Sequence, residues 1–232
     1  MKQIIKVDTM KNQTTMLTIV AATLVVAAAF IAGPLLNSYF SDKKDSHSDM
    51  NMAGKNSDSS LVQKDSDDYK MYAALKGDAY DKAFIEGMII HHEGAVEMAE
   101  LALISAKRQE IKDMAHDIIT AQNKEIGDMK NWQREWSYTQ STDHSNMNHD
   151  SSMSMADHMR IMMDQLHGKT GDAFDKAFLE QMIMHHQGAL NMAAPGATNA
   201  KHQEIKALTK AVVDAQTNEI KQMQNWQKEW SL

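Results

Sequence analysis

The chain contains no cysteine and only two prolines among its 232 residues. Without cysteine there can be no disulfide, no thiolate metal site, no cysteine nucleophile and no lipid-modified cysteine anchor. Proline interrupts helices because it lacks a backbone donor and clashes with the preceding turn, so its scarcity favours long helices. No segment of useful length alternates in hydropathy as a strand would, and the sequence therefore predicts an all-α protein.

An excess of positive charge is also missing. The net charge is −7, which argues against a nucleic-acid-binding protein and favours an affinity for cations. Methionine and histidine are abundant instead, with 20 and 11 residues respectively. The chain is therefore rich in thioether and imidazole groups while it lacks thiols.

An uncharged run of 21 residues occupies positions 16–36. As a helix it is long enough to cross about 30 Å of hydrocarbon. Lys2, Lys6 and Lys11 precede it, so the positive-inside rule places the N-terminus in the cytoplasm and the body outside. We expect a single-pass anchor in the cell membrane. The alternative is a signal peptide cleaved near the small residues 27–29, which would give a secreted or periplasmic protein.

The chain contains an internal duplication. Residues 77–136 align without a gap with residues 171–230 at a constant offset of 94, with 32 identities in 60 positions. Polar, Ser/Asp-rich segments flank the two copies and read as linkers. We predict an N-terminal anchor or signal segment (1–40), a flexible spacer (41–66), a first helical repeat (67–137), a Met/His-rich linker (138–156) and a second helical repeat (157–232).

Each repeat predicts two long helices. In the first repeat they span 78–105 and 109–137, and in the second 172–193 and 202–231, with short lead-in helices near 67–76 and 156–167. Pro195 and Gly196 should end the first long helix of the second repeat. Because one hairpin has too small a core, we expect an antiparallel four-helix bundle built from two hairpins with pseudo-twofold symmetry. The tryptophans near the ends of the second helices should close it.

The first helix of each repeat carries the candidate metal ligands. Met88, His91 and Met98 recur at helical spacing on one stripe, and His92 lies beside them. The second repeat carries Met182, His185, His186 and Met192 at the equivalent positions. We predict that each set binds one copper ion. The structural alternative is that the methionines fill the core and the histidines are merely packed.

The second helix places polar residues where apolar ones belong. Gln122 and Glu125 lie within its apolar stripe, and Gln216 and Glu219 repeat the arrangement. A buried carboxylate without a partner is costly. We therefore expect these residues to orient an imidazole of the first helix through its second nitrogen.

The linkers also contain metal-ligand types. A flexible segment must be ordered by each ion, at a cost of about 1–2 kcal/mol per fixed residue, so we expect these sites to be weak. The weak-site candidates are His47, Met50, Met52, His144, Met147, His149, Met153, Met155, His158 and Met159. Met162, Met163 and His167 follow shortly afterwards.

Ligand softness selects the metal. Thioether and imidazole without thiolate suit Cu(I) and Ag(I), while imidazole also accepts Cu(II) or Zn(II). Common enzyme motifs are missing: His92-Glu93 is not followed by the second histidine of a zinc protease motif, and neither first helix carries the Glu-x-x-His pattern of di-iron bundles.

Two sequence patterns resemble a known family. They are F-[IL]-E-x-M-I-x-H-H-x-G-A-x-x-M-A, starting at Phe84 and Phe178, and A-Q-x-x-E-I-x-x-M-x-x-W, starting at Ala121 and Ala215. They resemble the domain of unknown function 305 family, which is similar to ferritin-like four-helix proteins. The resemblance implies extracytoplasmic copper binding and copper tolerance, with the Met and His residues of both first helices as the site.

These observations favour a membrane-tethered protein that sequesters copper or passes it to a copper exporter or oxidase, and that is not an enzyme. Two other classes stay open at this point. One is a metal-dependent oxidase on a ferritin-like bundle, and the other is a structural or interaction module without metal.

Overall fold

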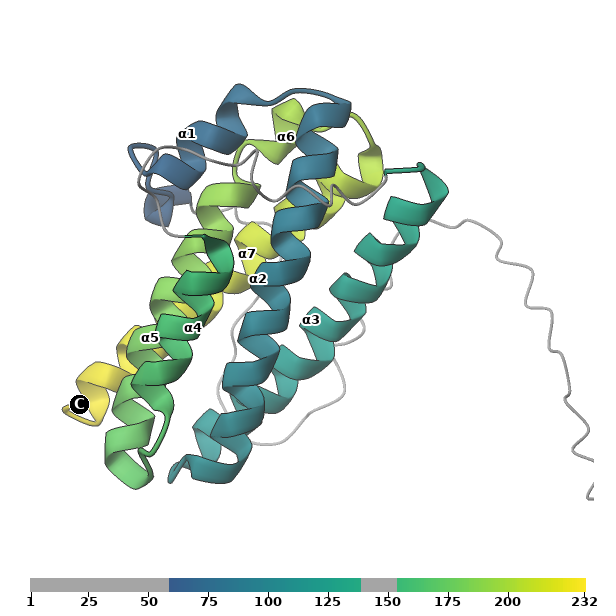
Figure 1. Cartoon of the computed structure of the whole chain (residues 1–232). Helices are drawn as coiled ribbons and strands as arrows, with labels where there is room; N and C mark the ends of the chain where they lie inside the picture. The colour runs from purple at the N-terminus through teal and green to yellow at the C-terminus, as the bar shows by residue number, and fades with distance from the viewer. Residues whose placement is uncertain (1–58, 139–153) are drawn as a thin grey trace, which may run out of the picture. The chain divides into compact units, whose positions relative to one another are not determined.

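The structure is a computed structural model that describes residues 59–138 and 154–232. Within these two ranges the elements are helical, with two isolated bridges and no strand (Figure 1). In chain order they are η1 (Ser59–Leu61), α1 (Asp67–Ala74), α2 (Asp78–Ser105), α3 (Gln109–Glu135), α4 (Met155–Leu166), α5 (Gly171–Ala193), α6 (Gly196–Asn199) and α7 (Gln203–Glu229).

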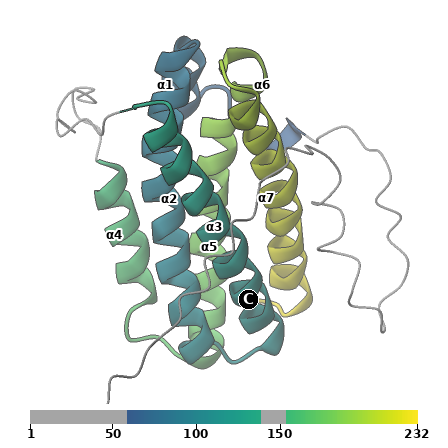
Figure 2. The same cartoon turned by 90° about the vertical axis from the view of Figure 1, so that its right-hand side faces the viewer.

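The long helices form a helical bundle. Helix α2 packs against α3, α5 packs against α7, and the two pairs meet where α2 contacts α5. Figure 2 shows α4 running along α2 on the side away from α7, while α1 and α6 lie together at one end in both views. The bundle therefore has α2 and α5, the helices with the candidate ligands, at its centre.

The helix boundaries follow the local sequence. Helix α2 has the predicted bounds, and the other long helices end within two residues of prediction. Helix α5 ends before Pro195, which cannot continue the backbone hydrogen bonding, so α5 has 23 residues where α2 has 28. Ser66 and Ser154 accept hydrogen bonds from backbone N–H groups at the starts of α1 and α4, the two lead-in helices.

The contacts between the two repeats are reciprocal: a residue of the first repeat contacts the second repeat, and its equivalent in the second repeat makes the same contact with the first. Gly77 of the first repeat bridges Ala200 of the second, and Gly171 of the second bridges Ala106 of the first. Both pairs obey the offset of 94 residues. Such reciprocity is what a pseudo-twofold axis between the repeats requires.

A buried aspartate in each repeat caps a helix of the other repeat. The Asp175 carboxylate accepts hydrogen bonds from the backbone N–H groups of Lys107 and Arg108 at 2.9 and 3.2 Å. Asp81 accepts the equivalent bonds from the two N–H groups before α7, at 3.0 and 2.9 Å. Both aspartates are completely buried. The cost of burying each charge is offset by these donors at a helix N-terminus.

The tryptophans at the ends of α3 and α7 also join the repeats. The ring of Trp136 stacks on His202, with centroids 3.7 Å apart. At the equivalent position in the other half, the Arg108 guanidinium lies 4.6 Å from the Trp230 ring centroid. Each tryptophan therefore closes the start of a helix in the opposite repeat.

The expected membrane segment at 16–36 lies outside the described residues, as does the spacer up to residue 58. Among the residues that the structure does describe, no helix is both long and apolar enough to cross a membrane.

Candidate metal centre

Four histidines lie buried where the two repeats meet. His91 and His92 come from α2, and His185 and His186 come from α5, and none exposes more than 2% of its surface. Adjacent histidines on a helix point about 100° apart. One histidine of each pair therefore faces the opposite repeat, while the other faces the second helix of its own repeat.

His91 and His185 are in direct contact across the interface between repeats. Their ring centroids lie 3.7 Å apart, and Nε2 of His185 is 2.9 Å from the backbone oxygen of His91. Because a carbonyl oxygen can only accept, Nε2 of His185 carries the proton. Its Nδ1 then has a free lone pair, and this atom is buried without a hydrogen-bond partner.

The other two histidines are held by carboxylates. Nε2 of His92 lies 2.6 Å from Oε2 of Glu125, and Nε2 of His186 lies 2.6 Å from Oε2 of Glu219. The structure thus places both glutamates against imidazoles, as expected from their position in an apolar stripe. Each carboxylate accepts a hydrogen bond from Nε2–H, which leaves Nδ1 as the other ring nitrogen, and both Nδ1 atoms are buried and unpartnered.

Burial keeps the central pair uncharged. Loss of solvation, followed by repulsion from the neighbouring histidines, holds the pKa of His91 and the pKa of His185 well below the ordinary value. Both rings are therefore neutral at neutral pH. A neutral imidazole can bind a metal ion without first releasing a proton.

The candidate methionines are divided between two core clusters, each of which mixes the repeats. Met88 and Met192 belong to one cluster, and Met98 and Met182 belong to the other. All four are at most 1% exposed. Because α2 and α5 meet across the pseudo-twofold axis, the first methionine of one motif shares a cluster with the last methionine of the other. The predicted grouping by repeat, with Met88 and Met98 on one ion, stays a prediction.

Three further polar side-chain atoms in the core have no hydrogen-bond partner, namely Oγ1 of Thr217 and two glutamine oxygens. Oε1 of Gln122 on α3 and Oε1 of Gln216 on α7 are buried and unpaired. Each glutamine precedes the glutamate that holds an imidazole by three residues, so it lies on the same helix face. Each glutamine therefore lies about one helical turn from the glutamate that orients a histidine.

Two glycines inside helices leave room for a histidine and a methionine side chain of another helix. A Cβ atom at Gly188 would lie 3.2 Å from Nε2 of His91, and one at Gly94 would lie 2.5 Å from Sδ of Met159. Glycine inside a helix costs about 1 kcal/mol relative to alanine. Here the missing side chain lets an imidazole approach α5 and a thioether approach α2.

The weak-site candidates fall into two groups. His47, Met50, Met52, His144, Met147, His149 and Met153 lie outside the described residues. Met155, His158 and Met159 are part of α4, so they are carried by a helix. Within the described ranges, no three or more His, Asp or Glu side chains are grouped so that they could hold a metal ion by themselves.

The chain is similar in structure to several solved proteins. CopM in the Cu(I)-bound form is 35% identical, with a TM-score of 0.53, and the similarity covers 65% of this chain and 96% of CopM. CopM has also been solved with Cu(II) and with silver, at the same identity. A DUF305 protein from Streptomyces coelicolor is 24% identical, with a TM-score of 0.55 over 64% of this chain and 91% of that protein, and this similarity supports the fold alone.

Among curated proteins, none matches this chain in sequence. The family model described as "Domain of unknown function (DUF305)" matches residues 33–110 and 81–227, which together span most of the chain. The matched residues include both histidine pairs and the glutamine and glutamate residues that accompany them on α3 and α7. The chain belongs to the DUF305 family.

Proposed function

We propose that this protein binds Cu(I), and Ag(I) by the same chemistry, in the core between its two repeats. The observation that carries the proposal is the set of four buried imidazoles whose Nδ1 atoms have no hydrogen-bond partner. A buried polar atom without a partner is costly, and a bound cation would remove that cost. Neutral imidazoles beside thioethers are soft ligands that suit a monovalent copper ion.

The ligand sets combine the two repeats. One set takes sulfur from Met88 and Met192, and the other takes sulfur from Met98 and Met182, in keeping with the two core clusters. The imidazoles complete each set from the middle of α2 and α5. Glu125 and Glu219 hold their histidines through Nε2, which fixes the ring orientation and makes the opposite nitrogen a better donor.

Similarity to CopM supports this choice of metal. CopM has been solved with Cu(I), Cu(II) and silver bound. This chain is 35% identical to CopM, over 65% of this chain and 96% of CopM. Zn(II) fits less well, because zinc sites draw on imidazole, carboxylate and thiolate rather than thioether. The role that follows is sequestration of copper, or its transfer to an exporter or oxidase, in copper tolerance.

We also propose that the protein binds metal without turning over a substrate. A ferritin-like oxidase needs carboxylates that bridge its metal ions, and the first helices lack the Glu-x-x-His pattern. The copper-loaded chain should therefore consume no O₂ beyond one oxidation of its bound Cu(I). Sustained O₂ uptake with a reductant would favour the oxidase instead.

The proposed location is outside the cell membrane, with the ferritin-like bundle tethered by residues 16–36. Protease added to intact cells should cut the 41–66 spacer and release the bundle. A spacer that resists protease in intact cells but not in lysed cells would place the bundle inside.

The core site is tested with substitutions that keep one nitrogen and remove the other. Glutamine places an amide donor near the position of Nε2 but has nothing at Nδ1, so His91→Gln with His185→Gln can retain the hydrogen bond to the carbonyl. We expect this double variant to lose tight Cu(I) binding in competition with a chromophoric chelator. His116 is exposed on α3, and His116→Gln is the matched control. Unchanged tight binding in a folded double variant would refute the core site.

A further inference from the structure

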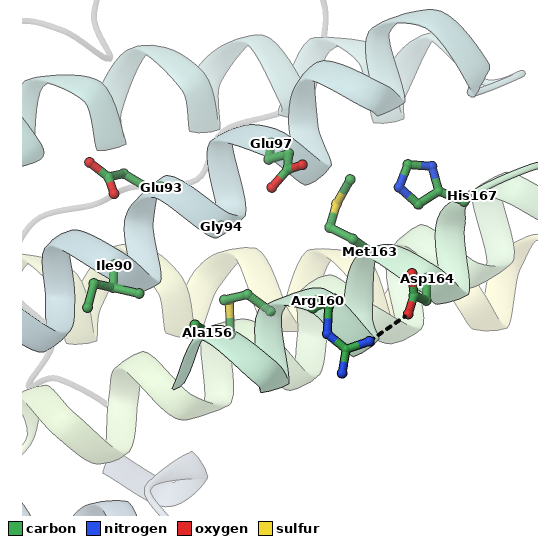
Figure 3. A pocket seen from close by; sticks show the side chains of 10 residues that line it. Ile90, Glu93, Gly94, Glu97, Ala156, Arg160, Met163, Asp164 and His167 are labelled. Carbon is green, nitrogen blue, oxygen red and sulfur yellow. Dashed lines mark hydrogen bonds and ion pairs between the residues drawn. The ribbon is translucent and has the colours of Figure 1, made fainter. Parts of the chain in front are cut away.

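A second cluster of metal-ligand types lies on the outside of the bundle. An open groove of about 380 Å³ runs between α2 and α4. Its α4 wall includes Met159, Met163 and His167. Figure 3 shows Met163 and His167 projecting from α4 into the space that Glu97 enters from α2. This groove is separate from the four core histidines, none of which lines it.

The α4 residues share one face of the helix. Met159, Met163 and His167 are spaced by four residues, so they lie above one another on successive turns. Met159 approaches α2 closely because Gly94 has no side chain there. Met163 is 7% exposed, whereas the imidazole of His167 is exposed at the end of the helix. Met163 and His167 are one turn apart, and Met159 lies one turn further back, so the three side chains extend over about 12 Å of the groove.

The duplication supplies an internal comparison. At the equivalent positions of the first repeat, 94 residues earlier, the chain has Asp65, Tyr69 and Ala73. None of these is a thioether or an imidazole. Packing of a lead-in helix against the bundle therefore does not require methionine and histidine at these positions. At these three positions the soft ligands occur in the second repeat and not in the first.

The α2 wall of the groove also carries residues that the other repeat lacks at the equivalent positions. Glu93 and Glu97 of α2 correspond to Gln187 and Asn191 of α5. The two amides bind backbone: Gln187 donates to the Leu61 carbonyl oxygen, and Asn191 accepts from a backbone N–H at 2.8 Å. In the α2 copy this packing role is replaced by carboxylates that line an open groove.

Acidic side chains outnumber basic ones along the groove. Glu93 pairs with Lys130 of α3 at 2.8 Å, and Asp164 pairs with Arg160 at 3.5 Å, while Glu97 adds a third acidic group. Negative charge attracts a cation to the groove, and the sulfur and nitrogen ligands then select a soft one. The electrostatic and chemical preferences of the groove agree.

We propose that the groove between α2 and α4 binds one monovalent soft cation, Cu(I) or Ag(I), through Met163 and His167, with the Met159 thioether one turn further along the groove. Glu97 and Glu93 draw the ion in. The site goes beyond the core site proposed above and does not depend on it. Because the first repeat lacks the ligands at these positions, we expect one such groove site rather than two among the described residues. Its exposed histidine makes it a surface site that can exchange its ion with solvent.

The test uses the full chain with Ag(I) as the probe in chloride-free buffer. Methionine methyl groups labelled with ¹³C report on each thioether, and single Met→Leu variants assign the resonances of Met159, Met163 and Met162. We expect Ag(I) to shift the Met159 and Met163 resonances. Met162 belongs to the same helix but does not line the groove, so its resonance is the internal control.

Binding stoichiometry gives an independent measurement. The variant Met159→Leu/Met163→Leu/His167→Gln should bind one Ag(I) fewer than the wild-type chain in calorimetry, whereas Met162→Leu should bind the full number. Leucine has nearly the volume of methionine, so the fold should survive, and circular dichroism checks it. Resonances of Met159 and Met163 that stay unshifted in the wild-type chain at saturating Ag(I) would overturn the site, even if the triple variant failed to fold.

The same labels separate this site from the core site. In the His91→Gln/His185→Gln variant, Ag(I) should still shift Met159 and Met163. If those shifts vanish together with the core site, the groove does not bind independently and the proposal is wrong as stated.

Discussion

His185 donates a hydrogen bond from Nε2 to the backbone carbonyl of His91, and the two imidazole rings lie 3.7 Å apart. The two residues are equivalent positions of the duplicated motif, and each repeat supplies one of them. The contact is reciprocal, because each ring interacts with the backbone of the other histidine. The pseudo-twofold relation therefore extends to the centre of the candidate site.

The central pair makes a prediction about pH. The pKa of His91 and of His185 is lowered in the folded state, so the unfolded chain binds protons more readily. Stability of the metal-free protein should thus be complete above about pH 6.5 and should fall as the pH drops below it, by about 1.4 kcal/mol per pH unit for each histidine. Urea unfolding with chelator at pH 8 and pH 5.5 measures the difference.

The His91→Gln/His185→Gln variant should show a smaller loss over the same pH interval, since glutamine does not titrate. His116→Gln should keep the wild-type slope, because His116 is exposed. Parallel pH dependences for the wild type and the double variant would show that these histidines are not the source.

The buried caps predict large effects on stability. Asp175→Ala would leave two backbone N–H groups without their acceptor and would remove the buried partner of Arg108, at a cost of about 3 kcal/mol in the free energy of unfolding. Asp172 lies in the same turn with its side chain 52% exposed, and Asp172→Ala should cost less than about 1 kcal/mol. Similar losses in urea denaturation for both variants would contradict the capping role.

The duplication predicts which substitutions Arg108 tolerates. Its equivalent His202 stacks on Trp136 and binds Asp81 at 2.7 Å, as Arg108 contacts Trp230 and binds Asp175 at 2.8 Å. A planar, nitrogen-bearing side chain is the common requirement. Arg108→His should therefore cost less in unfolding free energy than Arg108→Lys, which keeps the charge but loses the flat contact. The reverse order would show that charge alone matters.

The glycines predict opposite outcomes at three helix positions. Gly127 is exposed on α3 with open space around it, so Gly127→Ala should stabilise the protein by about 1 kcal/mol. Gly94→Ala would displace the Met159 side chain and should lower Ag(I) binding in the groove. Gly188→Ala would press on His91 and should cost stability instead. Thermal unfolding and Ag(I) titration measure both effects, and three equal gains would contradict the packing.

The linker should hold metal less tightly than the bundle. Replacing His144, Met147, His149 and Met153 together by serine should remove weak Cu(I) sites and leave the tightest ones, because a flexible segment loses entropy when it binds. Titration against chelators of graded affinity separates the two classes. Loss of the tightest site in this variant would assign it to the linker.

Local sequence patterns specified the helices well. Helical spacing and the proline after Ala194 are properties of neighbouring residues, so the bounds of α2 and the shorter α5 could be read directly. The duplication showed that the same unit occurs twice. The position of Glu125 in an apolar stripe required a buried partner, and the structure supplies His92. That inference succeeded because a buried charge has few acceptable neighbours.

Contacts between repeats depend on how the hairpins pack, and no local pattern encodes them. Asp81 and Asp175 are identical in the first turns of both copies, but a first-turn aspartate usually caps its own helix, so the cap across repeats was missed. The grouping of Met88 with Met192 and the contact of His91 with His185 likewise follow from α2 and α5 meeting about a pseudo-twofold axis. Periodicity tells which face of a helix is buried, but only the packed structure decides which residue lies opposite it.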